Sequence, residues 1–255
     1  MARATSPLRY PGGKLCLYPL VSRILKGNRL ERRHYAEPFA GGCGLALMLL
    51  YEGHVSDIHI NDVDTSIWAF WKSVLDHPQE IIYRIRKTPV TITEWHAQRE
   101  IHLSMDEDDP VALGFATFFL NRTNRSGIIK AAGVIGGRDQ SGPYKIDCRF
   151  NREELERRVK RIAKYRNRIH LSRRDALAFI KDTSSSLPST TFYCIDPPYF
   201  SKGQTLYTSF YDPEDHKILA DTILRLDNPW IVTYDNASTI SNTNSILNIQ
   251  LKQSD

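Results

Sequence analysis

The residues Asp196, Pro197, Pro198 and Tyr199 form the stretch whose types and spacing most directly suggest chemistry. They follow the apolar run FYCI, which is typical of a buried strand. The prolines fix the backbone, so an Asp196 oxygen and the Pro197 carbonyl can together accept both hydrogens of one amino group. Tyr199 offers a ring face on which a planar base can stack. The combination predicts a site that holds an aromatic amine and aims its nitrogen lone pair.

A glycine-rich turn, EPFAGGCG at residues 37–44, lies between a predicted strand and a predicted helix. Glycines at such a turn let the backbone approach a ligand closely. Asp62 follows about twenty residues later, just past the next predicted strand, where an acid can bond the hydroxyls of a ribose. The turn and the acid together predict a cofactor that contains adenosine.

The identity of that cofactor follows by elimination. PGGK at residues 11–14 departs from a phosphate-binding loop, because Leu8 replaces the first glycine and Leu15 replaces the Ser or Thr. The turn also departs from the GxGxxG spacing of dinucleotide sites. S-adenosylmethionine, which carries ribose hydroxyls but no phosphates, is the adenosine cofactor that remains.

Composition and charge narrow the class of protein. The chain has 255 residues and a formal net charge of +5, and residues 152–174 hold ten Lys or Arg against three Glu. Such an excess suits nucleic acid, although Leu155, Val159 and Ile162 recur at helical spacing and also indicate an amphipathic helix with a solvated face.

The four cysteines are far apart and no Cys/His cluster occurs, so we predict no metal site and a reducing, cytoplasmic setting. No apolar run is long enough for a membrane helix, and the first residues lack the apolar core of a signal peptide.

The pattern of apolar residues predicts an α/β fold interrupted by helices. Strands are expected at HYAEPF, VSDIHIND, RIHLS, FYCID and WIVTY, and a helix is expected to begin at Asp212-Pro213. Between them lie the helical patterns EIIYRIRK, ITEWHAQREIHLS and VALGFATFFLNR, followed by a glycine-rich loop from Arg122 to Arg149. We therefore predict a sheet domain from residues 1–75 and 166–255, and a mostly helical insertion at residues 76–165.

These residues resemble a known family. LRYPGGK, EPFAGGCG, FLNRTNRSG, DPPY and TYDN occur in the order found in the Dam-type DNA adenine-N6 methyltransferases, the alpha group of the amino-methyltransferases. The resemblance implies a Rossmann-like, mostly parallel methyltransferase sheet with an inserted target-recognition domain. It also implies methyl transfer from S-adenosylmethionine to the amino group of adenine in a specific sequence of double-stranded DNA. A base inside a duplex cannot reach such a site, so the adenine would have to be flipped out.

The resemblance assigns roles to individual residues. The target base would be held by Asp196, Pro197, Pro198 and Tyr199. The cofactor would be bound by Tyr10, Lys14, Glu37, Pro38, Phe39, Gly41, Gly44, Asp62, Asp175 and Asp196. The insertion would contact DNA through Asn121, Arg122, Asn124, Arg125 and Ser126, because Arg can contact guanine and Asn adenine in two places. We expect Arg157, Arg158, Lys160 and Arg161 either to contact phosphates or to be plainly exposed to solvent.

The end of the chain departs from the pattern. After WIVTYDNA the family usually continues with an aromatic-rich strand pair, whereas this chain ends in STISNTNSILNIQLKQSD, which has no aromatic residue. We therefore predict a shortened sheet edge, and keep as the alternative a DNA-binding relative whose catalysis is impaired by the altered C-terminus.

Methylation of cytosine would favour Ser at position 196, and methylation of a protein glutamine would favour Asn. We predict that the protein is a monomer and does not associate with membranes. A cognate restriction endonuclease is the expected partner if the chain serves restriction–modification.

Overall fold

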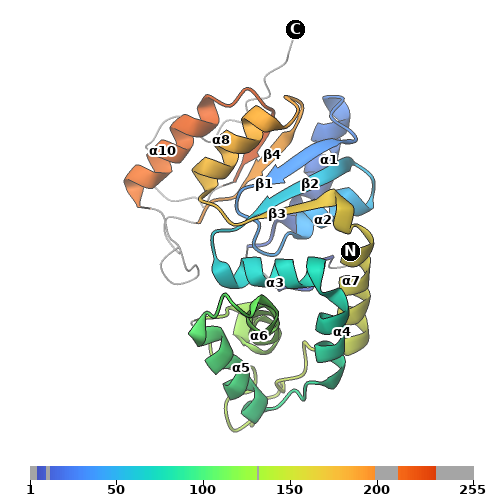
Figure 1. The fold of residues 1–255 in the computed structure, drawn as a ribbon, viewed down its shortest axis with the longest axis vertical. Helices are drawn as coiled ribbons and strands as arrows, with labels where there is room; N and C mark the ends of the chain where they lie inside the picture. The colour runs from blue at the N-terminus through green and yellow to red at the C-terminus, as the bar shows by residue number, and fades with distance from the viewer. Residues whose placement is uncertain (1–4, 10–11, 131, 199–211, 234–255) are drawn as a thin grey trace.

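The computed structural model describes residues 5–9, 12–130, 132–198 and 212–233. Its centre is a five-stranded sheet in the order β3-β2-β1-β4-β5, and every neighbouring pair is parallel (Figure 1). The strands are β1 (Arg33–Glu37), β2 (Val55–Asn61), β3 (Ile169–Ser172), β4 (Phe192–Ile195) and β5 (Trp230–Val232). β2 to β5 each lie within a predicted strand, β1 begins one residue before its predicted strand, and the α/β, mostly parallel fold class is confirmed. The C-terminal change predicted from STISNTNSILNIQLKQSD lies outside the described residues.

Helices flank the sheet and form a second body beside it. The helices next to the sheet strands in sequence are α1 (Tyr18–Gly27), α2 (Gly44–Tyr51), α3 (Thr65–Asp76), α8 (Ala176–Ser186) and α10 (Pro213–Leu224). The segment between α3 and β3 forms α4 (Pro78–Lys87), α5 (Ile92–Ser104), α6 (Pro110–Thr123) and α7 (Arg152–Lys164). The described residues also form the short 3-10 helices η1 (Lys14–Leu17), η2 (Arg125–Gly127) and η3 (Arg166–Arg168). The three helical patterns predicted for the middle of the chain are confirmed by α4, α5 and α6.

The start of α10 shows how sequence fixes an element boundary. The Asp212 side chain accepts hydrogen bonds from the backbone N–H groups of Glu214 and Asp215, and the Asp215 side chain accepts one from the Asp212 N–H. This capping box satisfies donors that the first turn of a helix leaves without partners, and a proline at the first position has no such donor. The helix therefore begins at the residue pair that the sequence indicated.

The sheet separates two apolar clusters. On one face α8 and α10 pack on Ala36, Tyr193 and Ile195, whereas on the other α1 and α2 pack beneath Tyr35 and Phe192. Successive residues of β1 and β4 therefore enter opposite clusters, as the two-residue period of a strand requires. Both faces are covered at β1 and β4, which makes these two strands the rigid centre of the fold.

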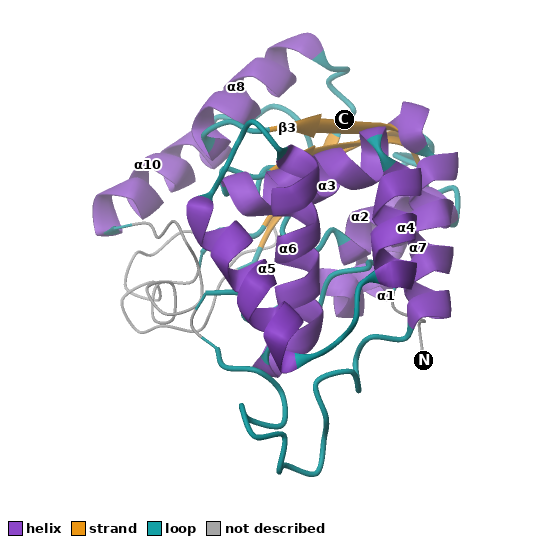
Figure 2. Cartoon of the chain, turned by 60° about the horizontal axis from the view of Figure 1, so that its bottom comes forward, coloured by secondary structure: helices purple, strands orange, loops and turns teal. Residues whose placement is uncertain are grey.

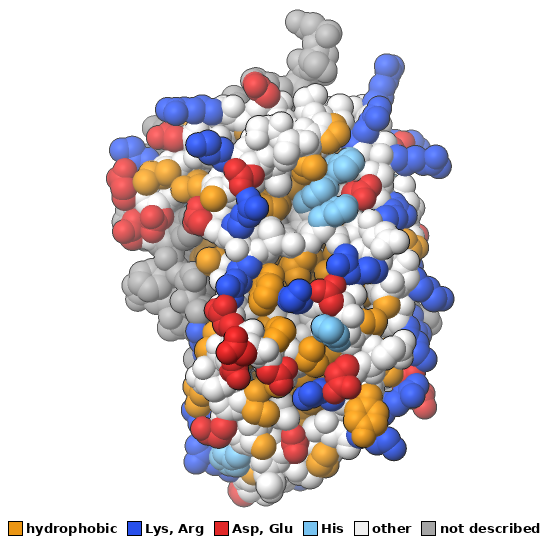
Figure 3. All heavy atoms as spheres, in the orientation of Figure 1, with side chains coloured by type: hydrophobic (Ala, Val, Ile, Leu, Met, Phe, Trp, Pro, Cys, Tyr) orange, Lys and Arg blue, Asp and Glu red, His pale blue; other side chains and the backbone are white. Residues whose placement is uncertain are grey.

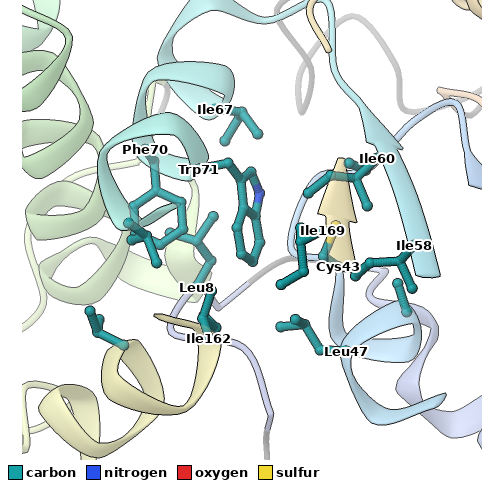
Figure 4. Close-up of a cluster of buried hydrophobic side chains, with 14 of the residues drawn as sticks. Leu8, Cys43, Leu47, Ile58, Ile60, Ile67, Phe70, Trp71, Ile162 and Ile169 are labelled. Carbon is teal, nitrogen blue, oxygen red and sulfur yellow. The ribbon is translucent and has the colours of Figure 1, made fainter. Parts of the chain in front are cut away.

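The apolar cluster that contains Tyr35 and Phe192 continues from the sheet into the helical body. Figure 4 shows Trp71 and Phe70 of α3 together with Ile58 and Ile60 of β2, and Ile162 of α7 beside them. Figures 1 and 2 show α3 between the sheet and α6, with α4 and α7 alongside. The predicted domain limits at residues 76 and 165 stay predictions, but the core crosses both, so the helical body packs directly against the sheet.

The histidines of the sheet form a group on one face. His34 and His59 approach to 2.8 Å between Nδ1 and Nε2, and the rings of His59 and His170 stack with centroids 4.5 Å apart. His170 is held by Asp57 at 3.0 Å, and the space-filling view shows histidine side chains together on this surface (Figure 3). Burial lowers the pKa of His59 to about 4, so this ring is neutral at physiological pH.

The predicted loop from Arg122 to Arg149 begins later than expected. α6 continues to Thr123, and the connection to α7 starts at Asn124, which bridges Val134 in antiparallel fashion. The helix is buried at every position from Leu113 to Thr123, so its polar end is packed inside the protein and not released into a loop. The boundary prediction was wrong because residues at this helix end are held by internal hydrogen bonds.

The contact between α3 and α6 depends on Gly114, which gives a prediction about stability. A Cβ at position 114 would lie 2.5 Å from the Ala69 carbonyl oxygen and 2.6 Å from the Ser73 hydroxyl. We expect Gly114→Ala to lower the free energy of unfolding by about 1–3 kcal/mol, because overpacking outweighs the better helix propensity of alanine. Gly27→Ala at the end of α1 is the matched control, since nothing lies within 4 Å of the added Cβ. Urea denaturation of both variants measures the difference, and an unchanged midpoint for Gly114→Ala would contradict this packing.

Candidate functional site

The strand order creates a crevice between β1 and β4. The chain runs outward from β1 through β2 to β3 on one side, and β4 and β5 extend the sheet on the other side. Ligands of open parallel sheets bind outside the carboxyl ends of the strands where the order reverses. Glu37 is the last residue of β1 and Asp196 follows the last residue of β4, so the switch point brings the predicted turn and the predicted DPPY motif together.

A cavity of about 360 Å³ occupies this position. Its wall is built by the N-terminal segment, the glycine turn, the end of β2, the start of α8 and the residues after β4. Of the predicted site residues described by the structure, those that line it are Lys14, Glu37, Pro38, Phe39, Gly41, Gly44, Asp62, Asp175, Asp196 and Pro198. Tyr10 and Tyr199 lie outside the described residues, and Pro197 is buried beside the cavity. Its volume lies within the range of about 300–1,000 Å³ typical of cofactor pockets.

The glycine turn is fixed by bonds from β2 and α3. The Ala40 N–H donates to the Asn61 carbonyl at 2.8 Å, and the Trp71 ring N–H donates to the Gly41 carbonyl at 2.9 Å. Gly41 has a φ of +45° and Cys43 a φ of +49°, so two residues of the turn are left-handed. Only glycine adopts this conformation without steric cost, which explains a glycine at position 41. The turn is therefore preorganised against the cavity.

Asp62 holds the same turn and faces the cavity. Its Oδ2 accepts a hydrogen bond from the Gly41 N–H at 2.8 Å, and its Oδ1 accepts one from the Asp64 N–H at 3.0 Å. Each oxygen keeps a second lone pair that can accept from a ligand hydroxyl. Burial, followed by repulsion from Asp64, raises the pKa of Asp62 to about 7.

Glu37 is a second carboxyl group in the wall. It is 7% exposed and accepts a hydrogen bond from the Tyr35 hydroxyl at 2.7 Å. Burial raises the pKa of Glu37 to about 7, although the bond from Tyr35 works in the opposite direction. The cofactor-free pocket thus holds Glu37 and Asp62 in a balance between charged and neutral forms near neutrality.

The raised pKa of Glu37 predicts how the free energy of unfolding changes with pH. The folded pKa of Glu37, about 7, lies above its ordinary value of 4.5, so the folded state binds a proton more tightly than the unfolded chain does. The stabilisation is complete below pH 4.5 and is lost as the pH rises to about 7. We expect the thermal midpoint of the cofactor-free protein to fall across this range and Glu37→Gln to flatten the fall. The slope left in the variant would come from the other groups with shifted pKa values, Asp62 and Asp196 among them, and equal slopes in both proteins would contradict the assignment.

Asp196 is held by two partners at the other side of the cavity. Its Oδ2 lies 2.5 Å from the Lys14 Nζ and its Oδ1 accepts a hydrogen bond from the Thr233 hydroxyl at 2.6 Å. Lys14 also donates to the Gly12 carbonyl at 2.7 Å. Burial raises the pKa of Asp196, while the positive charge of Lys14 limits the rise. The Asp196 carboxylate is thus oriented by two residues, Lys14 and Thr233, that are 182 and 37 positions away in the sequence.

Asp175 has a structural task as well as a place in the cavity wall. It caps α8, because its Oδ1 accepts from the N–H groups of Leu177 and Ala178 at 2.9 and 3.2 Å. The cavity also includes the neighbouring Arg174 and Ala176. The cap therefore fixes the position of this wall segment, whatever the second carboxylate oxygen contacts.

Asn61 is a site residue that sequence reasoning missed. Its side-chain amide donates to the carbonyls of Pro38 and Arg174 at 3.0 and 2.9 Å, and its oxygen accepts from the Ser172 hydroxyl and the Arg174 N–H. It is fully buried and ties the ends of β1, β2 and β3 together. The signal was an amide side chain near the end of the predicted strand VSDIHIND, directly before Asp62.

The five residues predicted to contact DNA lie in two different environments. Asn121, Arg122 and Asn124 are buried, and their side chains bond protein groups, whereas Arg125 and Ser126 are exposed. The Asn124 side chain accepts from the Trp95 ring N–H at 2.7 Å and donates to the Ile128 carbonyl at 2.9 Å. In this structure DNA can therefore reach the side chains of Arg125 and Ser126, while the other three build the loop that presents them.

The basic helix α7 also departs from expectation at two residues, of which Arg161 is half-buried with its guanidinium carbon 3.9 Å from the centroid of the Tyr51 ring. Arg157 and Lys160 are about half exposed and pair with Glu154 and Glu156. Arg158 is only 13% exposed on its side chain and donates to the Ser6 carbonyl at 2.7 Å. The prediction of phosphate contact or plain exposure was wrong for Arg158, because its guanidinium braces the segment that lines the cavity.

Comparison with known proteins identifies the family of the chain. A family model for the D12 class N6 adenine-specific DNA methyltransferases matches residues 10–253. A search of curated proteins gave no match. Within the described part of the chain, no helix could cross a membrane, and no three His, Cys, Asp or Glu side chains gather as metal ligands. Because the match runs across the glycine turn, Asp62 and the DPPY motif, the chain belongs to the D12 class of N6 adenine-specific DNA methyltransferases.

Proposed function

We propose that this adenine-specific DNA methyltransferase uses S-adenosylmethionine and methylates an adenine that is flipped out of duplex DNA. The observation that carries the proposal is the shared cavity, in which the preorganised glycine turn and Asp62 lie on one side and Asp196 on the other. A cofactor held at the turn and a base held at Asp196 would therefore face each other. The family match supports methylation of DNA adenine, and the cavity supports the finer assignment of cofactor and base.

The charges of the cavity fit S-adenosylmethionine. Glu37, Asp62 and Asp196 all line it, and burial is the main cause of the raised pKa values of Glu37 and Asp62. A ligand with a positively charged sulfur and amino group would favour the ionised form of these carboxyl groups. A dinucleotide or nucleoside triphosphate would instead add negative charge to carboxylates. The residues present thus fit the cofactor that the sequence predicted.

Each described residue has a defined task in this proposal. Asp62 would accept hydrogen bonds from the ribose hydroxyls, and Glu37 would face the methionine part of the cofactor across the glycine turn. Phe39 would also lie at the methionine part, and Asp175 would lie at the adenine of the cofactor. Lys14 would hold Asp196 in place until the base enters. Tyr10 and Tyr199, outside the described residues, keep their predicted roles in the cofactor pocket and in stacking.

Asp196 and the Pro197 carbonyl would accept the two hydrogens of the adenine N6 amino group. These bonds raise electron density on N6 and direct its lone pair toward the methyl donor. When bound, S-adenosylmethionine supplies a methyl group on a cationic sulfur, which is already an activated leaving group. Asp196 and the Pro197 carbonyl would hold N6 with its lone pair toward that methyl group, and Asp196 would pass the one proton that N6 loses on methylation to solvent. S-adenosylhomocysteine and N6-methyladenine are the products.

The helical body would contribute the recognition of DNA. Arg125 and Ser126 are exposed on the connection that follows α6, and we propose that residues 76–165 act as the target-recognition domain. The target sequence, the role in restriction–modification and the monomeric, cytoplasmic state remain predictions from the sequence. A relative that binds DNA without catalysis is the second candidate, and it rests on the changed C-terminal residues.

Calorimetric titration tests the cofactor assignment without requiring turnover. We expect S-adenosylmethionine and S-adenosylhomocysteine to bind with one-to-one stoichiometry, and ATP and NAD to give no heat of binding. A phosphate-bearing nucleotide that bound in preference to both would overturn the proposed cofactor.

A further inference from the structure

A cluster of arginines lies behind the segment of residues 5–9, whose Thr5, Ser6 and Leu8 line the cofactor cavity. At its centre is Arg122, 9% exposed, whose guanidinium donates to the Arg149 carbonyl from Nε at 2.7 Å and also from Nη2. Its Nη1 reaches the Pro7 carbonyl at 3.4 Å. The hydrogen-bond partners of this buried cation are therefore neutral carbonyl groups.

Burial, followed by repulsion from Arg158, Arg9 and Arg149, lowers the pKa of Arg122 to about 9, and Cys148 acts weakly in the opposite direction. Arg158 is balanced by Glu154 at 2.9 Å. Among the residues that the structure describes, Arg9, Arg122 and Arg149 form no ion pair. Three guanidinium groups thus lie close together, and no described carboxylate pairs with any of them.

The other two members of the cluster, Arg9 and Arg149, are held in place through their main-chain groups. Asn121 accepts a hydrogen bond from the Arg9 N–H at 2.7 Å and donates to the Arg9 carbonyl at 2.8 Å. The Arg9 guanidinium, half-buried, donates to the Asn124 carbonyl at 3.2 Å. Gly127 packs so tightly that a Cβ there would lie 2.4 Å from the Arg9 carbonyl oxygen. Arg149 is exposed, and Arg122 holds its backbone.

Burying a cation without a counter-ion costs free energy, and clustering cations adds repulsion. An anion beside the cluster would remove both costs, and arginine binds phosphate oxygens through paired N–H donors. The cluster adjoins the cavity wall and the exposed Arg125, and the substrate of this family is DNA. We propose that Arg9 and Arg149, supported by Arg122, bind one backbone phosphate of the DNA next to the flipped adenine. This inference rests on the proposed function, because it places DNA at the mouth of that cavity.

The test combines a protein change with a change in the DNA. Arg9→Gln/Arg149→Gln removes two guanidinium groups but keeps the carbonyl that Arg122 uses. We expect the double variant to bind cognate and random duplexes about tenfold more weakly and to lower the slope of log affinity against log salt by about one. Arg32→Gln/Arg33→Gln, which changes two exposed arginines at the opposite end of β1, is the control for net charge and is expected to keep the wild-type slope.

Duplexes that carry a single neutral methylphosphonate at successive positions around the target adenine locate the phosphate. We expect one position to weaken wild-type binding about tenfold and to have no further effect on the double variant, because both changes remove the same contact. Additive losses at every position would overturn the proposal. So would stabilisation of the DNA-free wild type by inorganic phosphate with an unchanged salt slope, which would identify a site for free anions.

Two further measurements, of folding and of methylation, separate a failure of this inference from other causes. An unchanged thermal midpoint and an unchanged cofactor Kd without DNA show that the variant is folded, and Arg149→Gln alone is the substitute if the double variant is not. If the wild type made no methyladenine but the DNA experiment still showed coupling, the proposed function would fail while the phosphate site stood. If methylation occurred and the losses were additive, the inference alone would fail.

Discussion

Replacing Asp196 by alanine is expected to lower the rate of methyl transfer by about 100-fold or more, with most of the affinity for cofactor and DNA retained. The lost acceptor acts on the adenine amino group mainly as its nitrogen attacks, so turnover suffers more than binding. Asp196→Asn should behave similarly, because an amide would direct N–H groups toward either Lys14 or the base. Single-turnover kinetics with saturating DNA and cofactor measure the effect.

A graded control is available next to this residue. Thr233→Val keeps the shape of the side chain but removes the hydroxyl that donates to Asp196 at 2.6 Å. We expect a smaller loss of rate than for Asp196→Ala, since Lys14 still holds the carboxylate. A turnover of Asp196→Ala within threefold of the wild type, in a protein with an unchanged thermal midpoint, would exclude Asp196 as the residue that orients the amine.

Replacing Asp62 by alanine is expected to weaken cofactor binding by roughly 1.5–3 kcal/mol, or about ten- to a hundredfold. Two causes act together, because the ribose loses a charge-assisted acceptor and the Gly41 N–H loses the bond that fixes the glycine turn. Calorimetric titration of S-adenosylmethionine measures the change. The matched control is Asp57→Asn on the same strand, which faces His170 and should keep the wild-type Kd. An unchanged Kd for Asp62→Ala would mean that the cofactor lies elsewhere.

Local patterns predicted the parts of the fold that local physics determines. The strands follow from short apolar runs, and α10 begins at Asp212 because its capping partners lie within three residues. The parallel order follows from the alternation of strands and helices, which forces right-handed crossovers. The positions of the glycine turn, Asp62 and Asp196 could therefore be inferred, since each ends a strand at the same edge of the sheet.

Contacts between distant residues could not be predicted in this way. The pairing of Lys14 with Asp196 spans 182 positions, and the clamp of Asn121 on Arg9 spans 112. The polar residues at the end of α6 were read as DNA contacts because Asn and Arg are the side chains that read bases. The better signal was the apolar character of the helix on all sides, which indicates that its polar positions are buried too.

The central claim is that one cavity brings a methyl donor and an adenine together at Asp196. The most direct measurement incubates the protein with methyl-labelled S-adenosylmethionine and duplex DNA of mixed sequence, and then analyses the nucleosides. The account predicts label in N6-methyldeoxyadenosine alone, one S-adenosylhomocysteine per methyl group transferred, and an initial rate of labelling that is lower by about 100-fold or more with Asp196→Asn. Label in a cytosine derivative, or measurable cofactor binding without any methylated nucleoside, would contradict it.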